Sequence, residues 1–529
     1  MSLEGDVEAP RRPPHHLHAE PWRGTVAGVV AAGTALGFGE LVASLGSSLP
    51  SLVAGVGGWL IDRSPGDVTR SAIDALGTAN KPVLLTAIVV VSLVVGGALG
   101  RRSVQTPAVG LVGFAGFGML GAAAASGEVA ATAAGSLTVA VAAAGVGIAT
   151  LWLLLTAGDG RIPLGANQIE SPTDPHASRR SFLGFAGAAT AFAGLTASGA
   201  GVVAGRSPAE VAREAVELPT PTSTIPLADA SFADIDGLAP LYTPNDSFFR
   251  IDTALRVPQV EPDRWSLTID GLVERTLTFT FDELSAMSLV ETDVTLACVS
   301  NRVGGDLVGN ARWLGVPLTD LLDRAGIAPE AEQVVGRSVD GFTAGFPLAA
   351  LDDGRPALVA IGMNGEPLPL RHGFPARLVV SGLYGYVSAT KWLESIELRT
   401  WDGFDGYWIP RGWSKEGPVH TQTRIDVPAD GSQVAAGPVA VAGVAWAPSR
   451  GIDRVEVRVD DGPWVDAELS DPIGDHAWRQ WLHRWEATPG SHEIRVRSTD
   501  GTGEVQTAEE QPPAPSGATG RHHIRVEVA

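Results

Sequence analysis

The chain is almost free of cysteine, since only Cys298 among its 529 residues is one. A single thiol excludes intramolecular disulfides, cysteine-rich zinc sites, iron–sulfur clusters and the CxxCH motif that attaches haem. Histidine is missing from the long apolar runs, because all eleven histidines lie outside them. Those runs therefore lack the axial ligands of a bis-histidine haem, and we expect no haem in this chain.

Positive charge is in deficit. The chain has 38 lysines and arginines against 59 acidic residues, which gives a formal net charge of -21. Proteins that bind nucleic acid need a basic surface against the phosphates. We therefore expect no nucleic-acid partner, and the excess of acid is explained by solubility.

The first two hundred residues contain long apolar runs. Crossing a bilayer takes about 20 apolar residues, and five stretches reach this length. They are residues 24–46, with Glu40 as the only charge, and the uncharged stretches 82–100, 103–127, 129–158 and 181–205. The weakly apolar stretch 51–61 could add a re-entrant segment. We predict a membrane domain of about five transmembrane helices over residues 1–206.

Basic residues between these stretches predict the orientation, because cytoplasmic loops carry the excess of lysine and arginine. With a cytoplasmic N-terminus, most of the arginines fall on the cytoplasmic side: Arg11, Arg12, Arg23, Arg101, Arg102, Arg161, Arg179 and Arg180. The longer loop on the other side holds Arg63, Arg70 and Lys81. Five crossings then place everything after about residue 205 outside. We expect a multi-pass protein of the cytoplasmic membrane with an extracytoplasmic catalytic domain.

Residues 178–183 read Ser-Arg-Arg-Ser-Phe-Leu and precede a mild, Ala/Gly-rich apolar stretch. This resembles the twin-arginine export motif, although here it is internal rather than N-terminal. Two arginines that only fix the membrane orientation would look the same, so both interpretations stay open. Export of a prefolded domain would suit a protein that acquires a cofactor in the cytoplasm.

The remainder divides into a linker and two domains. Prolines and small polar residues over 207–234 indicate a linker. Over 235–422, strand patterns (265–271, 291–298, 377–380) alternate with helix patterns (from Phe281, and 318–325), which predicts an α+β domain. From 423 to 529, period-two strands separated by Asp/Gly turns predict an immunoglobulin-like β-sandwich without the antibody cysteines. The fold class is therefore a transmembrane helical bundle, an α+β domain and a β-sandwich.

Cys298 is the first candidate for chemistry. It ends a predicted strand and precedes the Gly/Asn-rich loop 299–306, a usual place for a functional residue. Thiolates bind metals well, and Arg302 is expected to lower the pKa of a nearby thiol. We take Cys298 and Arg302 as candidate catalytic residues; a buried structural cysteine is the alternative.

A second group of candidates is His372, Arg377 and Lys391. His372 and Arg377 are five residues apart, and Lys391 follows fourteen later, among glycines, prolines and buried strand residues. Such hydrogen-bond donors suit a phosphate and a polar heterocycle.

Several segments, in this order, resemble the sulfite-oxidase family of molybdopterin enzymes. They are TLACVSN at 295–301, ARWLGVPL at 311–318, GMNGEPLP at 362–369, HGFPAR at 372–377, KWL at 391–393 and GYWIPRGW at 406–413. The resemblance covers about residues 235–529 and includes the sandwich, which is similar to the family's dimerisation-type domain. A homodimer is expected by this analogy.

The resemblance implies a molybdenum–molybdopterin cofactor whose metal is coordinated by Cys298. The segment 242–245 is similar to the family's N-terminal cofactor contact. The implied cofactor-binding residues are Asn245, Cys298, Ser338, Asp340, His372, Arg377, Ala389, Thr390 and Lys391. The implied activity is two-electron oxygen-atom transfer on a small substrate. Electrons would pass to or from an external electron-transfer protein or a quinone.

Three positions depart from the family pattern. Pro244 and Val303 stand where sulfite oxidases have arginines, and Phe342 stands near their active-site tyrosine. A pocket without those cations should bind a dianion poorly, so we expect the substrate not to be sulfite.

Two alternatives from other classes remain. One is a cofactor-free thiol enzyme with Cys298 as nucleophile and His372 as base. The other is a non-catalytic surface protein whose sandwich binds partners.

Overall fold

The computed structural model divides the chain into two compact units, Met1–Gly205 and Arg206–Ala529. The residues that it describes are 21–46, 49–65, 68, 71–72, 75–127, 131–158, 183–184, 186–194, 207–223, 232 and 234–529. The twin-arginine segment 178–182 and much of the predicted span 181–205 lie outside them.

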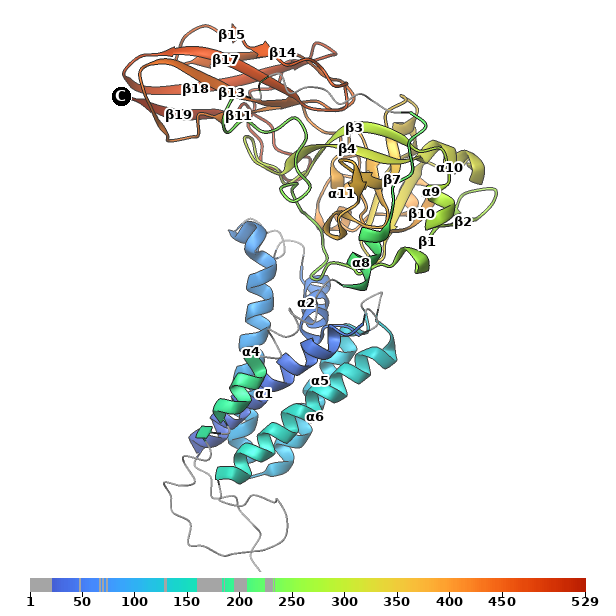
Figure 1. Ribbon diagram of the computed structural model, residues 1–529, viewed down its shortest axis with the longest axis vertical. Coiled ribbons are helices and arrows are strands. Elements are labelled where there is room, and N and C mark those ends of the chain that lie inside the picture. The colour runs from blue at the N-terminus through green and yellow to red at the C-terminus, as the bar shows by residue number, and fades with distance from the viewer. Residues whose placement is uncertain are drawn as a thin grey trace, which may run out of the picture. The chain divides into compact units, whose positions relative to one another are not determined.

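Within its described residues, the first unit contains four helices that are long and apolar enough to cross a membrane (Figure 1). They are α1 (Pro21–Ala43), α4 (Asn80–Ser103), α5 (Pro107–Ala125) and α6 (Ala133–Gly158). Four of the five predicted spans are thus long apolar helices. α2 (Leu52–Arg63) has 12 residues, about 18 Å of helix, which is too short to cross. A short 3-10 turn, η1 (Gly77–Ala79), precedes α4.

Glycines allow α1 and α4 to pack backbone against backbone. A Cβ atom added at Gly28 would lie 2.1 Å from the carbonyl oxygen of Gly96, so a larger residue does not fit this interface. A Cβ at Gly24 would lie 3.1 Å from Cα of Arg101. The start of α1 therefore lies beside the end of α4, and Arg23 and Arg101 lie at the same end of the bundle.

The second unit begins with α8 (Pro208–Ala215) and contains two sheets followed by a sandwich. The first sheet has the order β2-β1-β10-β5-β6: Leu277–Thr280, Ser266–Gly271, Leu393–Arg399, Gln333–Ser338 and Thr343–Pro347. The second has the order β3-β4-β7-β8, with β9 on β7: Val290–Ala297, Val308–Pro317, Ala357–Met363, Glu366–Pro367 and Arg377–Val380. β1 pairs with β10 in parallel and the other pairings are antiparallel, as an α+β domain predicts.

The helices of this domain are short. They are α9 (Phe281–Ser285), α10 (Leu318–Ala325) and α11 (Gly385–Ser388), with 3-10 turns η2 (Pro262–Arg264), η3 (Leu348–Leu351), η4 (Leu370–His372), η5 (Trp401–Gly403) and η6 (Ile409–Arg411). α9 starts with a capping box, in which the Thr280 hydroxyl accepts from the amide of Glu283 and the Glu283 carboxylate accepts from the amide of Thr280.

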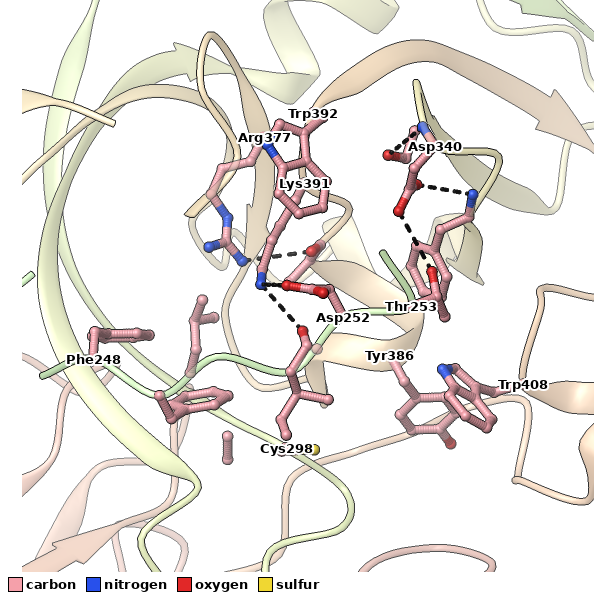
Figure 2. A pocket seen from close by; sticks show the side chains of 18 residues that line it. Phe248, Asp252, Thr253, Cys298, Asp340, Arg377, Tyr386, Lys391, Trp392 and Trp408 are labelled. Atoms are coloured by element: carbon pink, nitrogen blue, oxygen red, sulfur yellow. Dashed lines mark hydrogen bonds and ion pairs between the residues drawn. The ribbon is translucent and has the colours of Figure 1, made fainter. Parts of the chain in front are cut away.

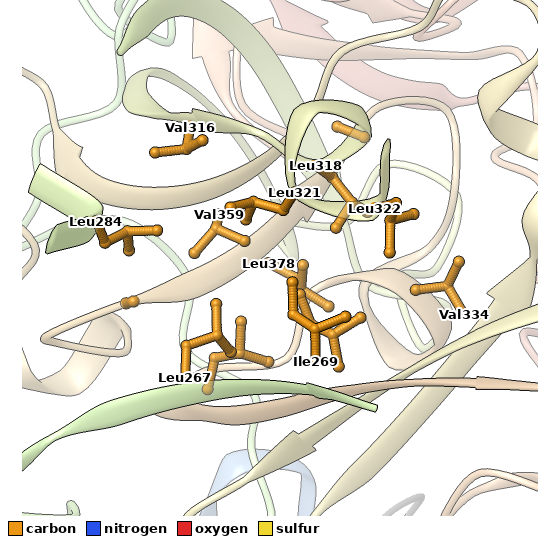
Figure 3. Packing of buried hydrophobic residues seen from close by; sticks show 14 of the residues in the cluster. Leu267, Ile269, Leu284, Val316, Leu318, Leu321, Leu322, Val334, Val359 and Leu378 are labelled. Atoms are coloured by element: carbon orange, nitrogen blue, oxygen red, sulfur yellow. The ribbon is translucent and has the colours of Figure 1, made fainter. Parts of the chain in front are cut away.

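The core of the α+β domain forms around α10. Its buried residues Leu318, Leu321, Leu322 and Ala325 recur at i, i+3, i+4 and i+7, so they share one face of the helix. They pack with residues of both sheets, among them Leu267 and Val359 (Figure 3). Full burial of each leucine stabilises the domain by about 1.5–3 kcal/mol.

The C-terminal region is a β-sandwich of two sheets, as its period-two pattern predicts (Figure 1). One sheet has the order β11-β13-β17-β16: Gln422–Val427, Gly437–Trp446, Arg479–Ala487 and Glu468–Leu469. The other has the order β12-β19-β18-β14-β15: Gln433–Val434, His523–Val528, Gly490–Asp500, Ile452–Val459 and Val465–Asp466. Trp481, Val455 and Ile494 belong to the apolar core of the sandwich.

The hairpin of β3 and β4 positions Cys298. The two strands pair from Val290↔Gly315 to Ala297↔Val308, so the loop between them begins at Cys298. Side chains alternate between the two faces of β3. Val294 and Leu296 belong to one apolar cluster, whereas Ala297 and Val299 belong to another.

Candidate functional site

Cys298 lies in the wall of a pocket that has about 730 Å³ of empty volume, part of it open to solvent. Five segments line it: residues 248–253, 296–298, 338–342, 377–392 and Trp408. Arg377 and Lys391 point into this space from the side opposite Cys298, and Tyr386 lies beside Trp408 (Figure 2). The pocket therefore brings a thiol, two cations and several aromatic rings together.

The thiol of Cys298 is held in a tight turn. The Cys298 amide donates to the carbonyl of Leu307 at 2.9 Å, and the Asn301 amide donates to the carbonyl of Cys298 at 3.0 Å. The residue is 8% exposed, and burial raises the pKa of its thiol. The expectation that Arg302 lowers this pKa is wrong, because burial raises the pKa instead, and Arg302 is exposed and does not line the pocket.

Arg377 is a buried cation. β9 places it in the pocket wall, 3% exposed, with its guanidinium carbon 5.0 Å from the ring centroid of Trp313. Its nitrogens donate to the backbone carbonyls of His372 (3.2 Å), Leu378 (3.4 Å) and Ala389 (3.5 Å). Among the described residues no carboxylate pairs with it, and burial lowers its pKa to about 9. A buried guanidinium without an anion is costly, so the site is suited to an anionic ligand.

Lys391 is the second cation in the wall. Its Nζ atom donates to Asp252 Oδ2 at 3.0 Å and to the carbonyl of Ile251 at 3.2 Å. Burial lowers the pKa of Lys391 to about 8, against the opposing effect of Asp252. The ammonium group is thus already paired.

Ser338, Asp340 and Phe342 form the turn between β5 and β6, and all three line the pocket. The Ser338 amide donates to the carbonyl of Phe342 at 2.9 Å, and the Phe342 amide donates to Asp340 Oδ1 at 3.1 Å. The side chain of Thr253 donates to Asp340 Oδ2 at 3.5 Å. These bonds fix the turn against the segment 248–253.

Besides Arg302, three of the predicted cofactor-binding residues do not line the pocket: Asn245, His372 and Thr390. His372 is 0% exposed, and its Nε2 atom is 2.8 Å from the carbonyl oxygen of Asn245, while its Nδ1 atom has no hydrogen-bond partner in the structure. Burial lowers the pKa of His372 to about 3, so the ring is neutral. Thr390 is buried too, and its hydroxyl is 3.5 Å from the carbonyl of Gly336.

The structure therefore brings six predicted residues into the lining of one pocket: Cys298, Ser338, Asp340, Arg377, Ala389 and Lys391. It adds lining residues that the sequence did not predict: Phe248, Phe249, Ile251, Asp252, Thr253, Gly385 and Tyr386. Leu296, Ala297 and Trp392 also line the pocket and lie inside the recognised segments 295–301 and 391–393. Residues 249–253 belong to no helix or strand, so no periodic pattern pointed to them. Trp408, by contrast, lay inside a recognised segment, 406–413.

The residues present fit a cofactor that carries an anionic group and a polar heterocycle. The guanidinium of Arg377 has no anionic partner among the described residues. It donates to the carbonyl of His372, and the Nδ1 atom of that histidine has no hydrogen-bond partner in the structure. Within the described residues no three His, Cys, Asp or Glu side chains gather to hold a metal. A metal beside Cys298 would therefore need further ligands from a bound cofactor.

Comparison with known proteins gives the class. Residues 254–408 match the model of the oxidoreductase molybdopterin binding domain, and residues 422–496 match that of the bacterial Ig domain. Human mitochondrial sulfite oxidase is 30% identical over an alignment of 301 residues that covers 48% of this chain and 55% of the relative. The uncharacterised oxidoreductase YuiH of Bacillus subtilis (strain 168) is 34% identical over 156 residues, 29% of this chain and 74% of the relative.

The chain belongs to the sulfite-oxidase family of molybdopterin-dependent oxidoreductases. It spans about half the length of the curated sulfite oxidases that it matches. Among solved structures, the sulfane dehydrogenase SoxCD of Paracoccus pantotrophus is similar with a TM-score of 0.49 and 24% identity, over 55% of this chain and 82% of that one.

Proposed function

We propose that this chain is a membrane-anchored enzyme that binds a molybdenum–molybdopterin cofactor through Cys298 and transfers an oxygen atom to or from a small substrate. The cofactor would supply the two-electron redox chemistry, and the protein would supply binding, orientation and electrostatics. Cys298 would hold the metal. Arg377 and Lys391 would hold the anionic group of the pterin, and Ser338, Asp340 and Ala389 would contact it from the same wall.

The observation that carries this proposal is the unpaired guanidinium of Arg377. A buried arginine whose hydrogen bonds go only to backbone carbonyl groups is unfavourable unless an anion completes its environment. A phosphate would do so with charge-assisted hydrogen bonds. Three residues that do not line the pocket would support the lining residues: Asn245, His372 and Thr390. The carbonyl of Asn245 orients the His372 ring, and the carbonyl of His372 accepts a hydrogen bond from Arg377.

The substrate is proposed to be something other than sulfite. The two cations among the lining residues are Arg377 and Lys391; we assign both to the cofactor, and Lys391 also pairs with Asp252. Phe342 lines the pocket without a hydroxyl group, and Val303 does not line it. A dianion would meet no free cation among these lining residues, whereas a less charged substrate would meet aromatic rings.

Arg302 has no supporting role in this proposal, because it is exposed and outside the wall. The thiol-enzyme alternative is weakened by His372, which does not line the pocket and whose pKa of about 3 makes it a poor base at neutral pH. A non-catalytic surface protein would not explain why Arg377 and Lys391 are buried in the lining of a pocket.

The catalytic domain is proposed to lie outside the cytoplasmic membrane. Arg23 and Arg101 at one end of the bundle support a cytoplasmic N-terminus by the positive-inside rule. Electrons would be exchanged with an external protein or a quinone. Homodimer formation through the sandwich and use of the segment 178–183 for export belong to the same proposal.

The test is metal and pterin analysis of the detergent-purified full chain, wild type beside Cys298→Ser. About one molybdenum and one pterin per chain is expected, with an altered metal spectrum and no turnover in the variant. Oxidised pterin is read by its fluorescence. Neither metal nor pterin in protein from a host that makes the cofactor would refute the proposal, as would a Cys298→Ser protein whose metal spectrum equals that of the wild type.

A further inference from the structure

The strand that precedes Cys298, β3, lies at the edge of its sheet among the described residues. One side of it therefore pairs with β4, and the other side has no described strand along most of its length. Residues 222–223 cover the beginning of that open side, through a bridge between Ser223 and Val290. The end of β3, next to Cys298, is covered by a different part of the chain.

The C-terminal sandwich supplies that cover. The loop before β17 approaches β3, where the amide of Thr295 donates to the carbonyl of His476 at 2.9 Å. The amide of Trp478 donates to the hydroxyl of Thr295 at 2.7 Å, and this hydroxyl is 3.0 Å from Asn310 Oδ1 on β4. Thr295 therefore joins the sandwich to both strands of the hairpin, three residues before Cys298.

Apolar packing also joins the sandwich to the residues on either side of Cys298. Ala297 and Val299, its two neighbours in the chain, are 1% and 3% exposed. They belong to one cluster with the sandwich residues Val444, Trp446 and Trp478. The residues on both sides of the thiol thus pack on the sandwich, while the thiol itself lines the pocket.

The tip of the loop is held as well. The guanidinium of Arg424 donates to the carbonyl of Gly305 at 2.9 Å. Gly304 has a φ of +76°, and a Cβ atom there would lie 2.2 Å from the ring of His522. That ring is fixed, because its Nδ1 atom accepts from the amide of Ile425 at 3.0 Å.

We propose that the sandwich is the positioning element of the Cys298 loop, with Thr295, Arg424 and His522 as positioning residues that fix where the thiol stands in the pocket. This inference rests on the proposed role of Cys298 as metal ligand. The loop would be held in place in the cofactor-free protein by three contacts with the sandwich: at Thr295, at Ala297 and Val299, and at Gly304 and Gly305. Loss of one attachment is expected to let the loop open more often.

The single cysteine makes the test direct, because only one thiol can be alkylated in the whole chain. Cofactor-free full-length protein, made in a host without molybdopterin and kept in detergent, is treated with iodoacetamide at fixed pH, and intact mass gives the rate. A thiol that is only 8% exposed reacts faster when its surroundings open more often. Thr295→Val keeps the side-chain shape but loses the hydroxyl, Thr295→Ser keeps the hydroxyl, and Gly304→Ala pushes against His522.

The rate at Cys298 is expected to rise about tenfold in Thr295→Val and in Gly304→Ala, and to stay within about twofold of wild type in Thr295→Ser. Thr421→Val is the matched control, because its hydroxyl bonds Asp500 within the sandwich and has no contact with the loop in the structure. Wild-type rates in both loop variants would overturn the inference, as would an equal rise in Thr421→Val.

Hydrogen exchange in the wild-type chain keeps the inference falsifiable if a variant does not fold. The amides of Thr295 and Trp478 are expected to exchange with protection factors within about tenfold of each other, since each is held at the same contact. A larger difference would count against the sandwich as support. Alkylation and hydrogen exchange need no cofactor, so a negative result in them would leave the assignment of Cys298 as metal ligand unaffected. An unchanged metal spectrum in Cys298→Ser would refute that assignment but would not affect the conclusion about the Cys298 loop.

Discussion

Replacing Arg377 by methionine is expected to stabilise the protein without cofactor and to weaken retention of the pterin. Burial lowers the pKa of this guanidinium from 12.5 to about 9, which corresponds to about 5 kcal/mol against the charged form. The three bonds to carbonyl groups, at 3.2 to 3.5 Å, return about 1 kcal/mol each. Methionine has a similar length and needs no partner, so the cofactor-free chain should gain about 2 kcal/mol.

Thermal unfolding in detergent would show this gain as a rise of about 3 °C in Tm. The same substitution should reduce pterin affinity by about thirtyfold, because a charge-assisted bond worth about 2 kcal/mol is lost. Arg454→Met is the control, since Arg454 is half exposed and its removal should leave both quantities unchanged. A lower Tm for cofactor-free Arg377→Met together with full pterin content would refute the reasoning.

Three further predictions concern stability. Asp252→Asn should lower the unfolding free energy of the cofactor-free chain by about 3 kcal/mol, because it leaves Lys391 buried and unpaired; an unchanged Tm would contradict this. Asp500 is 0% exposed and hydrogen bonds lower its pKa to about 2, so Asp500→Asn should cost about 2 kcal/mol at pH 7. That contribution is present above pH 3.8 and is lost as the pH falls through 2, so denaturant unfolding should show the variant and the wild type converging in acid. Leu321→Ala should cost about 2–5 kcal/mol in the same assay, against less than about 0.5 for the exposed Val465→Ala.

Local patterns predicted the elements around the site well. The helix expected at 318–325 is α10, because its four buried residues follow helical spacing, and the strand expected at 377–380 is β9. The strand expected at 291–298 is β3, shifted by one residue, so Cys298 begins the loop instead of ending the strand. These elements have strong periodicity or turn signals at their ends.

The pocket was predicted only in part. Cys298, Arg377 and Lys391 stood out because they carry chemistry beside loops or glycines. Asp252 and Phe248 were missed, since they lie on an irregular segment whose place is set by tertiary contacts such as the bond to Lys391. The prediction that Arg302 lowers the pKa of Cys298 was wrong for two reasons. Closeness in sequence does not fix the direction of a side chain in a loop, and burial of the thiol raises its pKa more than nearby charges lower it.

The part of the sandwich that contacts β3 lies far from it in the sequence, which has a consequence for synthesis of the chain. Thr295 and Trp478 are 183 residues apart, and Leu241 and Trp478 are 237 apart. A ribosome that has reached residue 422 has made every strand of the two central sheets and none of the sandwich. Until then the end of β3 is an open sheet edge beside the apolar residues Ala297 and Val299, the kind of surface on which nascent chains aggregate. The thiol therefore reaches its final surroundings only after His522, seven residues from Ala529, has been added. A chain released early would expose this edge permanently.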